Sequence, residues 1–211
     1  MANYIQQVEK KHYSGSAYRN TDRWMSYYHQ IALVRSCSPK TILEIGCGTG
    51  TVSRELKNEG CVVSTLDIAT DLEPDIVGSV LEIPLPDTSY DVVCAFEVLE
   101  HLKSEDVPHA LKEMARVART HVLVSLPHPG WVFSLIGKIP LFKRFEFFFQ
   151  LPFFWKTHVF NGEHYWELGK KNHSIQWLVS HAQSTNLRLK IFTKHADDPA
   201  HRFFLFEKLN S

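Results

Sequence analysis

The chain has 211 residues, of which 44% are hydrophobic and 22% are charged, and this ordinary globular composition excludes disordered, collagen-like and fibrous classes. Its length fits one domain with a single core. Lysine plus arginine and aspartate plus glutamate number 23 each, so the bulk charge does not favour a nucleic-acid partner. We therefore expect one globular domain that spans residues 1–211 and binds no nucleic acid.

The cysteine pattern and the apolar segments predict a cytoplasmic protein without a transmembrane segment. The cysteines form no CxxC pair and lack the dense spacing of a secreted disulfide scaffold, which indicates free thiols. Residues 1–11 lack the apolar stretch of a secretory signal. The longest apolar region, residues 131–155, is interrupted by charges and prolines, whereas a spanning helix needs about 20 apolar residues.

The N-terminal region, residues 1–38, is predicted to be a helical extension of this domain. Residues 1–20 are polar with scattered tyrosines. Asp22 is a suitable N-cap, and from Trp24 to Val34 apolar and aromatic side chains recur at helical spacing. We expect this helix to pack on the main sheet.

A strand, a helix and a second strand follow within about thirty residues, which is the size of a βαβ unit. Thr41–Ile45 is a short apolar run of strand length. Thr49–Asn58 has a helical pattern that Gly60 ends, and Cys61–Leu66 is the second buried strand. The two strands are predicted to lie parallel, with a right-handed crossover.

Three more strands and one helix are predicted before the next change of pattern. The strands are Ile76–Val80, Asp91–Phe96 and His121–Leu126. Between the last two, Ser104–Val117 carries an apolar stripe at helical spacing. This part of the chain therefore continues the alternation of strands and helices.

The alternation lapses over Pro127–Gly169, a segment too long for an ordinary connection, which we expect to be functional or partly helical. A helix at Ser174–Ser184 and two strands, Leu187–Lys194 and Arg202–Leu209, follow it. The whole pattern predicts a three-layer α/β/α fold with a doubly wound, mostly parallel sheet. The last two strands are expected to form an antiparallel hairpin at one edge.

A glycine-rich loop lies between the strand and the helix of the βαβ unit. The sequence ILEIGCGTG places Gly46, Gly48 and Gly50 where the backbone can turn sharply and approach a ligand closely. Asp67 follows the second strand, where a carboxylate can bind both ribose hydroxyls of a nucleoside. Each feature alone has a structural alternative, a tight turn or an ordinary loop aspartate, but in this order they indicate a nucleoside site.

The loop spacing GxGxG differs from the dinucleotide fingerprint GxGxxG, which needs a glycine where Thr51 stands. Further along, Ser89–Leu102 reads SYDVVCAFEVLEHL. With LEIGCGTG, this stretch makes residues 41–126 resemble the class I S-adenosylmethionine-dependent methyltransferases, in particular the type 11 methyltransferase-domain subgroup. The resemblance implies a Rossmann-like fold, S-adenosyl-L-methionine as cofactor and S-adenosyl-L-homocysteine as product.

The resemblance also implies which residues bind the cofactor. Asp67 would hold the ribose, and Glu44 would hold the methionine ammonium directly or through water, unless its carboxylate is simply satisfied by backbone N–H groups. The family often has an acid that binds adenine where this chain has Ser79, so that contact falls to Ser79 or to the nearby backbone. The full set is Glu44, Gly46, Cys47, Gly48, Gly50, Asp67, Ile68, Ser79, Val80, Leu81, Phe96 and Glu97.

Methyl transfer from a sulfonium is an in-line displacement that depends mainly on alignment, so no base is obligatory. A hydroxyl acceptor would gain from a base, and histidine suits that task. Glu97, His101 and His128 follow the fourth and fifth strands. The resemblance makes His101 part of the scaffold; His128 is the better base, with a satisfied loop histidine as its alternative. His164 is a second catalytic candidate, and no metal is expected because the histidines and acids lack a ligand spacing.

The segment 127–169 is predicted to be an aromatic-rich cap inserted after the fifth strand, which folds over the site as a lid. Its aromatic side chains either pack inward, line a pocket for an apolar or lipid-linked acceptor, contact a membrane interface, or bind a partner. A polar and aromatic cluster of the kind that orients an acceptor ends the segment: Glu163, His164, Tyr165 and Trp166.

We therefore expect a methyltransferase that acts on oxygen or nitrogen of a small-molecule acceptor. Two other functions stay open. A catalytically silent methyltransferase-like scaffold would keep the same loop and acid, and a nicotinamide-dependent oxidoreductase would bind a related cofactor in the same fold. The sequence does not indicate the acceptor or the oligomeric state.

Overall fold

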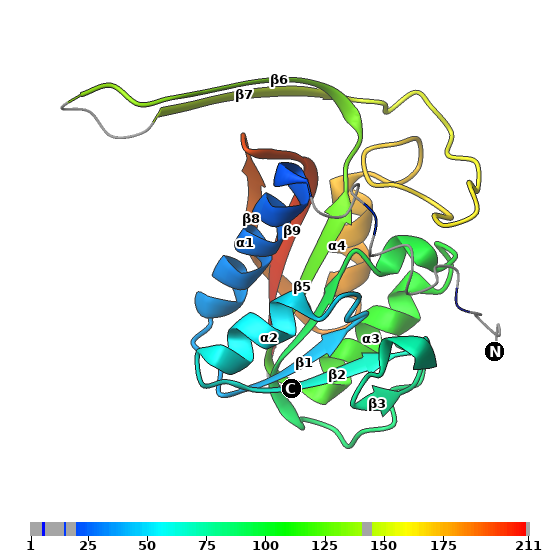
Figure 1. Ribbon diagram of the computed structural model, residues 1–211. Coiled ribbons are helices and arrows are strands. Elements are labelled where there is room, and N and C mark those ends of the chain that lie inside the picture. The colour runs from blue at the N-terminus through cyan, green and yellow to red at the C-terminus, as the bar shows by residue number, and fades with distance from the viewer. Residues whose placement is uncertain (1–5, 7–14, 16–19, 141–144, 210–211) are drawn as a thin grey trace.

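A computed structural model describes residues 6, 15, 20–140 and 145–209. Its main sheet has seven strands in the order β3-β2-β1-β4-β5-β9-β8 (Figure 1). The first five in this order are parallel, and β9 is antiparallel to both β5 and β8. This arrangement confirms the predicted mostly parallel sheet with an antiparallel C-terminal edge. The strands are β1 (Thr41–Ile45), β2 (Val62–Asp67), β3 (Ile76–Val77), β4 (Tyr90–Phe96), β5 (Ala118–Pro127), β8 (Leu187–His195) and β9 (Asp198–Lys208).

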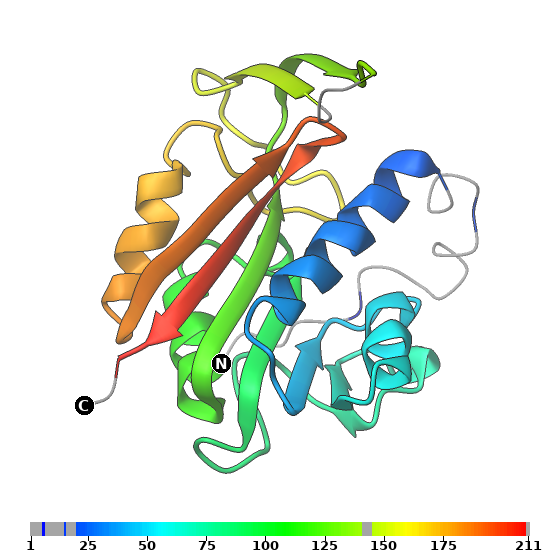
Figure 2. The same ribbon diagram turned by 90° about the vertical axis from the view of Figure 1, so that its left-hand side faces the viewer.

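Helices cover both faces of the sheet and bury its apolar side chains. On one face α1 (Thr21–Arg35) and α2 (Thr51–Asn58) pack on the strands, and on the other face α3 (Val107–Val117) and α4 (Ile175–Gln183) do so. Figure 2 shows α1 and α4 on opposite sides of β8, β9 and β5. Two short 3₁₀ helices, η3 (Thr70–Leu72) and η4 (Leu99–His101), follow β2 and β4.

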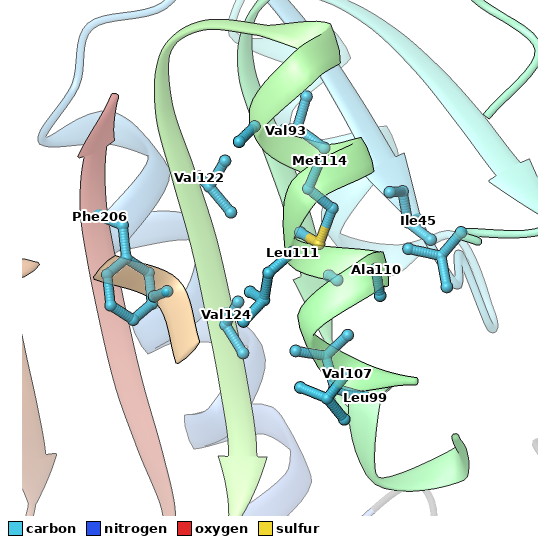
Figure 3. Close-up of a cluster of buried hydrophobic side chains, with 14 of the residues drawn as sticks. Ile45, Val93, Leu99, Val107, Ala110, Leu111, Met114, Val122, Val124 and Phe206 are labelled. Carbon is cyan, nitrogen blue, oxygen red and sulfur yellow. The ribbon is translucent and has the colours of Figure 1, made fainter. Parts of the chain in front are cut away.

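The larger of the two hydrophobic clusters lies between the sheet and the layer formed by α3 and α4. Figure 3 shows Leu111 and Met114 of α3 among Val122 and Val124 of β5 and Ile45 of β1. All five side chains are almost fully buried. The apolar stripe of α3 packs on parallel strands that are buried on both faces. This packing fixes the positions of the carboxyl ends of these strands.

Several predicted boundaries shift in the structure, including the start of β9, which is Asp198 instead of Arg202. Helix α1 is capped by Asn20, whose side chain accepts a hydrogen bond from the N–H of Arg23 at 2.8 Å, so the predicted cap at Asp22 is wrong. Helix α3 begins at Val107 instead of Ser104. Strand β3 keeps only the two residues that pair with β2. Most of the predicted N-terminal extension before residue 20 lies outside the described residues.

The segment after β5 forms a second, two-stranded sheet. Strands β6 (Gly130–Gly137) and β7 (Phe145–Pro152) pair antiparallel, and Figure 1 shows this hairpin running past the end of the main sheet and projecting beyond it. The expectation that Pro127–Gly169 is partly helical is wrong for its described residues, which contain strands and turns. Among the described helices, none is long and apolar enough to span a bilayer.

Candidate functional site: the carboxyl edge of the sheet

The glycine loop follows β1 and has a backbone that only glycine adopts readily. Gly46, Gly48 and Gly50 have φ angles of 74°, 49° and 67°, in the left-handed region where a Cβ is disfavoured. At Gly46 a Cβ would also overlap the Cγ2 methyl of Val98. Gly50 is the N-cap of α2 and offers no side-chain cap. No side chain of these three residues therefore fills the turn. The first N–H groups of α2, which have no partner within the helix, are available to a ligand bound at the loop.

Asp67 ends β2 directly beside this loop. The parallel register pairs Ile45 with Leu66, and the N–H of Gly46 donates to the carbonyl of Leu66 at 2.9 Å. One Asp67 oxygen accepts a hydrogen bond from the N–H of Ala69 at 2.9 Å, and the Cys47 thiol lies 4.0 Å from the other. Burial raises the pKa of Asp67 above its ordinary value. Loop and acid therefore come together as the sequence predicted.

Two neighbouring residues form the surroundings of that acid. Ile68, the residue after Asp67, is 37% exposed, so its side chain is available to contact a ligand. Cys47 is buried, and burial with the charge of Asp67 raises the pKa of its thiol to about 12. The thiol is consequently protonated at neutral pH and serves as a packing group.

Glu44 lies on β1 below the loop and is only 3% exposed. Its Oε2 atom has no hydrogen-bond partner in the described part of the chain. Burial raises the pKa of Glu44 to about 8, and hydrogen bonding to Ser53 opposes that shift. A buried carboxyl oxygen without a partner is costly, so Glu44 needs a cationic or hydrogen-donating group, or its own proton, to be stable there.

Most of the polar groups predicted to contact adenine already form hydrogen bonds within the chain. The Ser79 hydroxyl accepts a hydrogen bond from the N–H of Leu81 at 3.2 Å, and the Leu81 carbonyl lies 2.9 Å from Nε2 of His109. Val80 and Leu81 are 5% and 7% exposed and belong to the core. Of the predicted contacts, the Ser79 oxygen and the backbone of Val80 therefore stay the better candidates.

Glu97 stands at the end of β4 with a φ angle of 56°, which is unusual for a residue with a side chain. Its Oε1 accepts a hydrogen bond from the Ser125 hydroxyl at 2.6 Å, and its Oε2 lies 3.3 Å from Nε2 of His201. Phe96, the preceding residue, is 7% exposed and packs in the core beneath α1 and α2. Glu97 is thus a fixed group at the carboxyl edge.

Sequence reasoning missed His201 and Asp198, which complete the surroundings of Glu97. Nδ1 of His201 lies 2.6 Å from Oδ1 of Asp198, and Asp198 is fully buried. The negative charges of Glu97 and Asp198 outweigh burial and raise the pKa of His201. One signal was present in the sequence: an antiparallel last strand must begin at the edge where the parallel strands end, so the start of β9 belongs to the site.

His128 follows β5 but is enclosed by its surroundings. It is 5% exposed, its N–H donates to the carbonyl of Ala200 at 2.7 Å, and Gly169 approaches its ring so closely that a Cβ there would collide with it. Burial, assisted by the positive charge of Arg202, lowers the pKa of His128 to about 4. Its ring Nδ1 lies 3.2 Å from Oε1 of Gln150 on β7, so His128 anchors the hairpin.

With this geometry in place, the comparisons with known proteins identify the fold. Residues 43–125 match the family model described as a methyltransferase domain. A probable S-adenosylmethionine-dependent methyltransferase of Mycobacterium tuberculosis is 33% identical over 119 residues, covering 48% of this chain and 41% of that protein. Residues 43–125 of this chain therefore match a methyltransferase domain, and the chain is similar to S-adenosylmethionine-dependent methyltransferases.

Other proteins similar to this chain are also methyltransferases. A ubiquinone biosynthesis O-methyltransferase of Photorhabdus laumondii is 30% identical over 119 residues, covering 46% of this chain and 48% of that protein. The chain therefore spans less than half the length of these two curated relatives. The crystal structure of a Burkholderia thailandensis 1,6-didemethyltoxoflavin-N1-methyltransferase shares the fold, with a TM-score of 0.62 at 11% identity, over 95% of this chain and 87% of that one.

The structure also gathers one glutamate and two histidine side chains at η4 and beside it. Ligand atoms of Glu100, His101 and His164 all lie within 4.8 Å of one another, close enough to hold a metal ion. Glu100 is fully buried, and neither of its carboxyl oxygens has a hydrogen-bond partner among the described residues. Burial raises its pKa, and the negative charge of Glu97 adds to that shift. Long-range folding assembles this cluster, so no spacing in the sequence could show it.

A second group of possible metal ligands, His29, His195 and Asp197, is less suited to an ion. The two histidine rings stack with an interplanar angle of 6° and a centroid distance of 3.5 Å. Nitrogen lone pairs lie in the ring plane, so parallel stacked rings direct them side by side and not toward one point. His29 instead pairs with Asp197, with Nε2 2.8 Å from Oδ1.

The end of the predicted cap is attached to η4. The N–H of Tyr165 donates to the carbonyl of Glu100 at 2.9 Å, and the indole N–H of Trp166 donates to the carbonyl of Leu102 at 3.1 Å. Nδ1 of His101 lies 3.0 Å from the carbonyl oxygen of Glu163. The predicted cluster of residues 163–166 is therefore brought to the carboxyl end of β4.

Proposed function

We propose that this chain binds S-adenosylmethionine at the glycine loop and transfers its methyl group to a small-molecule acceptor. The observation that carries the proposal is the placement of the left-handed loop and Asp67 side by side at the carboxyl edge of β1 and β2. In doubly wound sheets this crevice, next to the switch in strand order, is where a nucleoside ligand binds. The unpartnered, buried oxygen of Glu44 adds a place for a cationic group.

Each side of the crevice has a task in this proposal. Asp67 accepts hydrogen bonds from the ribose hydroxyls, and the loop backbone at Gly46 and Gly48 allows the ligand to approach closely. Glu44 stabilises the methionine ammonium, directly or through water, which would also lower the raised pKa of its carboxyl group. The edge near Ser79 faces the adenine. When bound, the cofactor supplies an electrophilic sulfonium methyl, and the chain supplies position.

The acceptor is proposed to bind under the segment 127–169. His128 ties the start of this segment to β9, and the hydrogen bonds of Tyr165 and Trp166 tie its end to η4. Both attachments lie at the carboxyl edge, which supports the proposal that the segment folds over the acceptor side of the site. An oxygen or nitrogen acceptor fits a displacement at the sulfonium carbon.

If the acceptor is a hydroxyl, His164 is the better of the two candidate bases. A base works best when its pKa is near the operating pH, and His128 has a pKa of about 4. His164 is less buried than His128, and its Nδ1 lies 3.3 Å from Oε1 of Glu167, which fixes the orientation of the ring. Lys170, 2.6 Å away, holds Glu167 in turn.

We also propose that the chain works in a reducing compartment such as the cytoplasm. All four cysteines are free thiols. Burial raises the pKa of the Cys94 thiol as it does that of Cys47, so both are protonated and unreactive at neutral pH. Free, inert thiols are typical of reducing compartments.

Calorimetric titration with S-adenosylmethionine tests the cofactor assignment. Asp67→Asn should weaken binding roughly ten- to a hundredfold, because hydrogen bonds to a charged group contribute about 1.5–3 kcal/mol. The matched control is Asp87→Asn, since Asp87 is an exposed carboxylate that pairs with Arg116 away from the glycine loop. Equal binding by both variants would disprove the ribose role, and tight binding of NADH in place of S-adenosylmethionine would indicate an oxidoreductase.

Turnover needs a separate experiment because the acceptor is unidentified. Protein that binds the cofactor is incubated with a metabolite extract and methyl-tritiated S-adenosylmethionine, and labelled products are separated by chromatography. Label in a small molecule that requires the protein supports the proposal. Cofactor binding without any labelled product from polar or lipid extracts would favour the silent scaffold.

A further inference from the structure

The β6–β7 hairpin presents an apolar face that the rest of the described chain does not cover. Side chains alternate between the two faces of a strand, and the register pairs Trp131, Phe133 and Leu135 of β6 with Leu151, Phe149 and Phe147 of β7. These residues and Phe145 therefore share one face, which we call the outer hairpin face. Apart from Leu151, the large side chains on it are 43–64% exposed: Trp131, Phe133, Leu135, Phe145, Phe147 and Phe149.

The opposite face holds the hairpin on the domain. The ring of Phe148 lies 5.4 Å from the Lys194 ammonium and 5.4 Å from the Arg202 guanidinium, which belong to β8 and β9. The amide of Gln150 donates to the carbonyl of His128 at 2.6 Å. Because these contacts use the inner face, the outer hairpin face points away from the contacts with β8 and β9.

Such a surface indicates a partner on physical grounds. Contiguous exposed apolar patches of this kind are rare on proteins that act alone and mark interaction sites. The loop after β7 extends the same character, since Phe154, Trp155 and Phe160 are 59%, 45% and 48% exposed.

The charge of the segment selects among the partners. Residues 130–162 contain four basic residues, Lys138, Lys143, Arg144 and Lys156, and one acidic residue, Glu146, whereas the whole chain is neutral. A second copy of the chain would bring a segment of the same net positive charge, and like charges across an interface oppose association. An anionic lipid surface offers both an apolar interior and the opposite charge.

The aromatic groups at the base of the hairpin fit the same environment. Trp131, Phe153 and Trp155 contact one another, with each pair of ring centroids 5.9–6.0 Å apart. The Lys156 ammonium lies 4.2 Å from the centre of the Phe153 ring. Tryptophan rings beside lysine are typical of the boundary between lipid headgroups and hydrocarbon.

We propose that the outer hairpin face docks on an anionic lipid bilayer. The hairpin would lie along the surface, because an open two-stranded sheet that crossed the bilayer would leave backbone N–H and C=O groups of both edges without partners in hydrocarbon. Docking requires neither cofactor nor turnover. Its consequence for catalysis rests on the proposed function: the acceptor side of the site would face the membrane and receive an apolar or lipid-linked acceptor.

Vesicle co-sedimentation of the full chain tests the docking. The chain should pellet with phosphatidylcholine vesicles that contain phosphatidylglycerol, pellet less with phosphatidylcholine alone, and lose binding as salt is raised, because the charge attraction is screened. Phe133→Ser/Phe147→Ser on the outer hairpin face should weaken binding by roughly tenfold or more. The matched control Val132→Ser changes an exposed residue of the same strand on the inner face and should bind like the wild type.

Two further measurements make the outcome decisive. Lys138→Glu, at an exposed position near the hairpin turn, should weaken binding to the anionic vesicles without affecting the fold. Calorimetry with S-adenosylmethionine on the same samples separates a failed docking proposal from a failed function. The docking proposal is overturned if wild type pellets with neither vesicle, if Phe133→Ser/Phe147→Ser binds equally well, or if light scattering shows a dimer that this variant dissociates.

Discussion

Gly46→Ala should be markedly more destabilising than the same substitution at another left-handed glycine. The φ angle of Gly46 is 74°, which costs an alanine about 1–2 kcal/mol. The added methyl would also overlap Cγ2 of Val98 at the end of β4, and overpacking of this kind costs about 1–3 kcal/mol. We therefore expect Gly46→Ala to lower the free energy of unfolding by about 2–5 kcal/mol.

Gly60→Ala is the matched control for the backbone cost. Gly60 has a φ angle of 91°, and a Cβ there would meet no atom within 4 Å. Both variants reduce the conformational entropy of the unfolded chain by the same amount, so this effect cancels in the difference between their free energies of unfolding. The excess cost of Gly46→Ala over Gly60→Ala, about 1–3 kcal/mol by urea unfolding, measures the contact with Val98 alone.

The double variant Gly46→Ala/Val98→Ala completes the test. Removing the methyl groups of Val98 should leave only the backbone cost at position 46, so Gly46→Ala should cost about as much in that background as Gly60→Ala costs in the wild type. The reasoning is refuted if the costs of Gly46→Ala and Val98→Ala simply add, or if the two glycine variants are equally stable. Because the loop must shift to admit the methyl, binding of S-adenosylmethionine should weaken in Gly46→Ala and recover in part in the double variant.

Two histidines predict opposite dependences of stability on pH. Burial lowers the folded pKa of His128 from 6.5 to about 4, so its contribution to stability is complete above pH 6.5 and is lost as the pH falls toward 4. Wild type should therefore lose up to about 3 kcal/mol over this interval relative to His128→Gln, as urea unfolding at several pH values would measure. The folded pKa of His201 is raised, so its contribution is complete below pH 6.5 and is lost as the pH rises through the folded pKa. The stability difference between wild type and His201→Gln should accordingly shrink as the pH rises above 6.5 and through the raised folded pKa, and a constant difference would show that the charges of Glu97 and Asp198 do not stabilise the imidazolium.

The cofactor half of the site could be predicted because its structure depends on short-range features. The strand, loop and helix from residue 41 to residue 58 follow one another in the sequence, and their apolar periodicity and glycine spacing determine the local geometry. Asp67 reaches the loop through the next parallel strand, which a βαβ unit usually places beside the first. Prediction of Asp67 therefore required no long-range information.

The acceptor half depends on pairings that local patterns do not determine. His201 and Asp198 reach Glu97 because β9 lies antiparallel to β5, with Pro127 opposite His201. The helix α4 and the whole hairpin separate these strands in the sequence. The strand order, in which β9 lies between β5 and β8, is needed to place the first residues of β9 relative to Glu97.

The hairpin escaped prediction for a different reason. A half-covered strand usually alternates apolar and polar residues, but here Val132, Ile136 and Phe148 are apolar on the inner face as well. The resulting run of apolar residues has neither strand nor helix periodicity. The outer hairpin face becomes visible only once the register between β6 and β7 is known.

The match to the methyltransferase domain family ends at residue 125, two residues before the end of β5. The parallel strands up to that point place the glycine loop, Asp67 and Glu97, which every acceptor would require in the same positions because the sulfonium has one geometry. The chain after residue 125 provides the hairpin, His164, and the His201–Asp198 pair against Glu97. We infer that this second part determines which acceptor is methylated, so substitutions in it should change acceptor preference while leaving the affinity for S-adenosylmethionine largely intact. Exchange of residues 128–168 with the corresponding segment of a methyltransferase of known acceptor, followed by calorimetry and turnover with that acceptor, would decide this. Loss of cofactor affinity in a folded chimera would show that the two halves do not act separately.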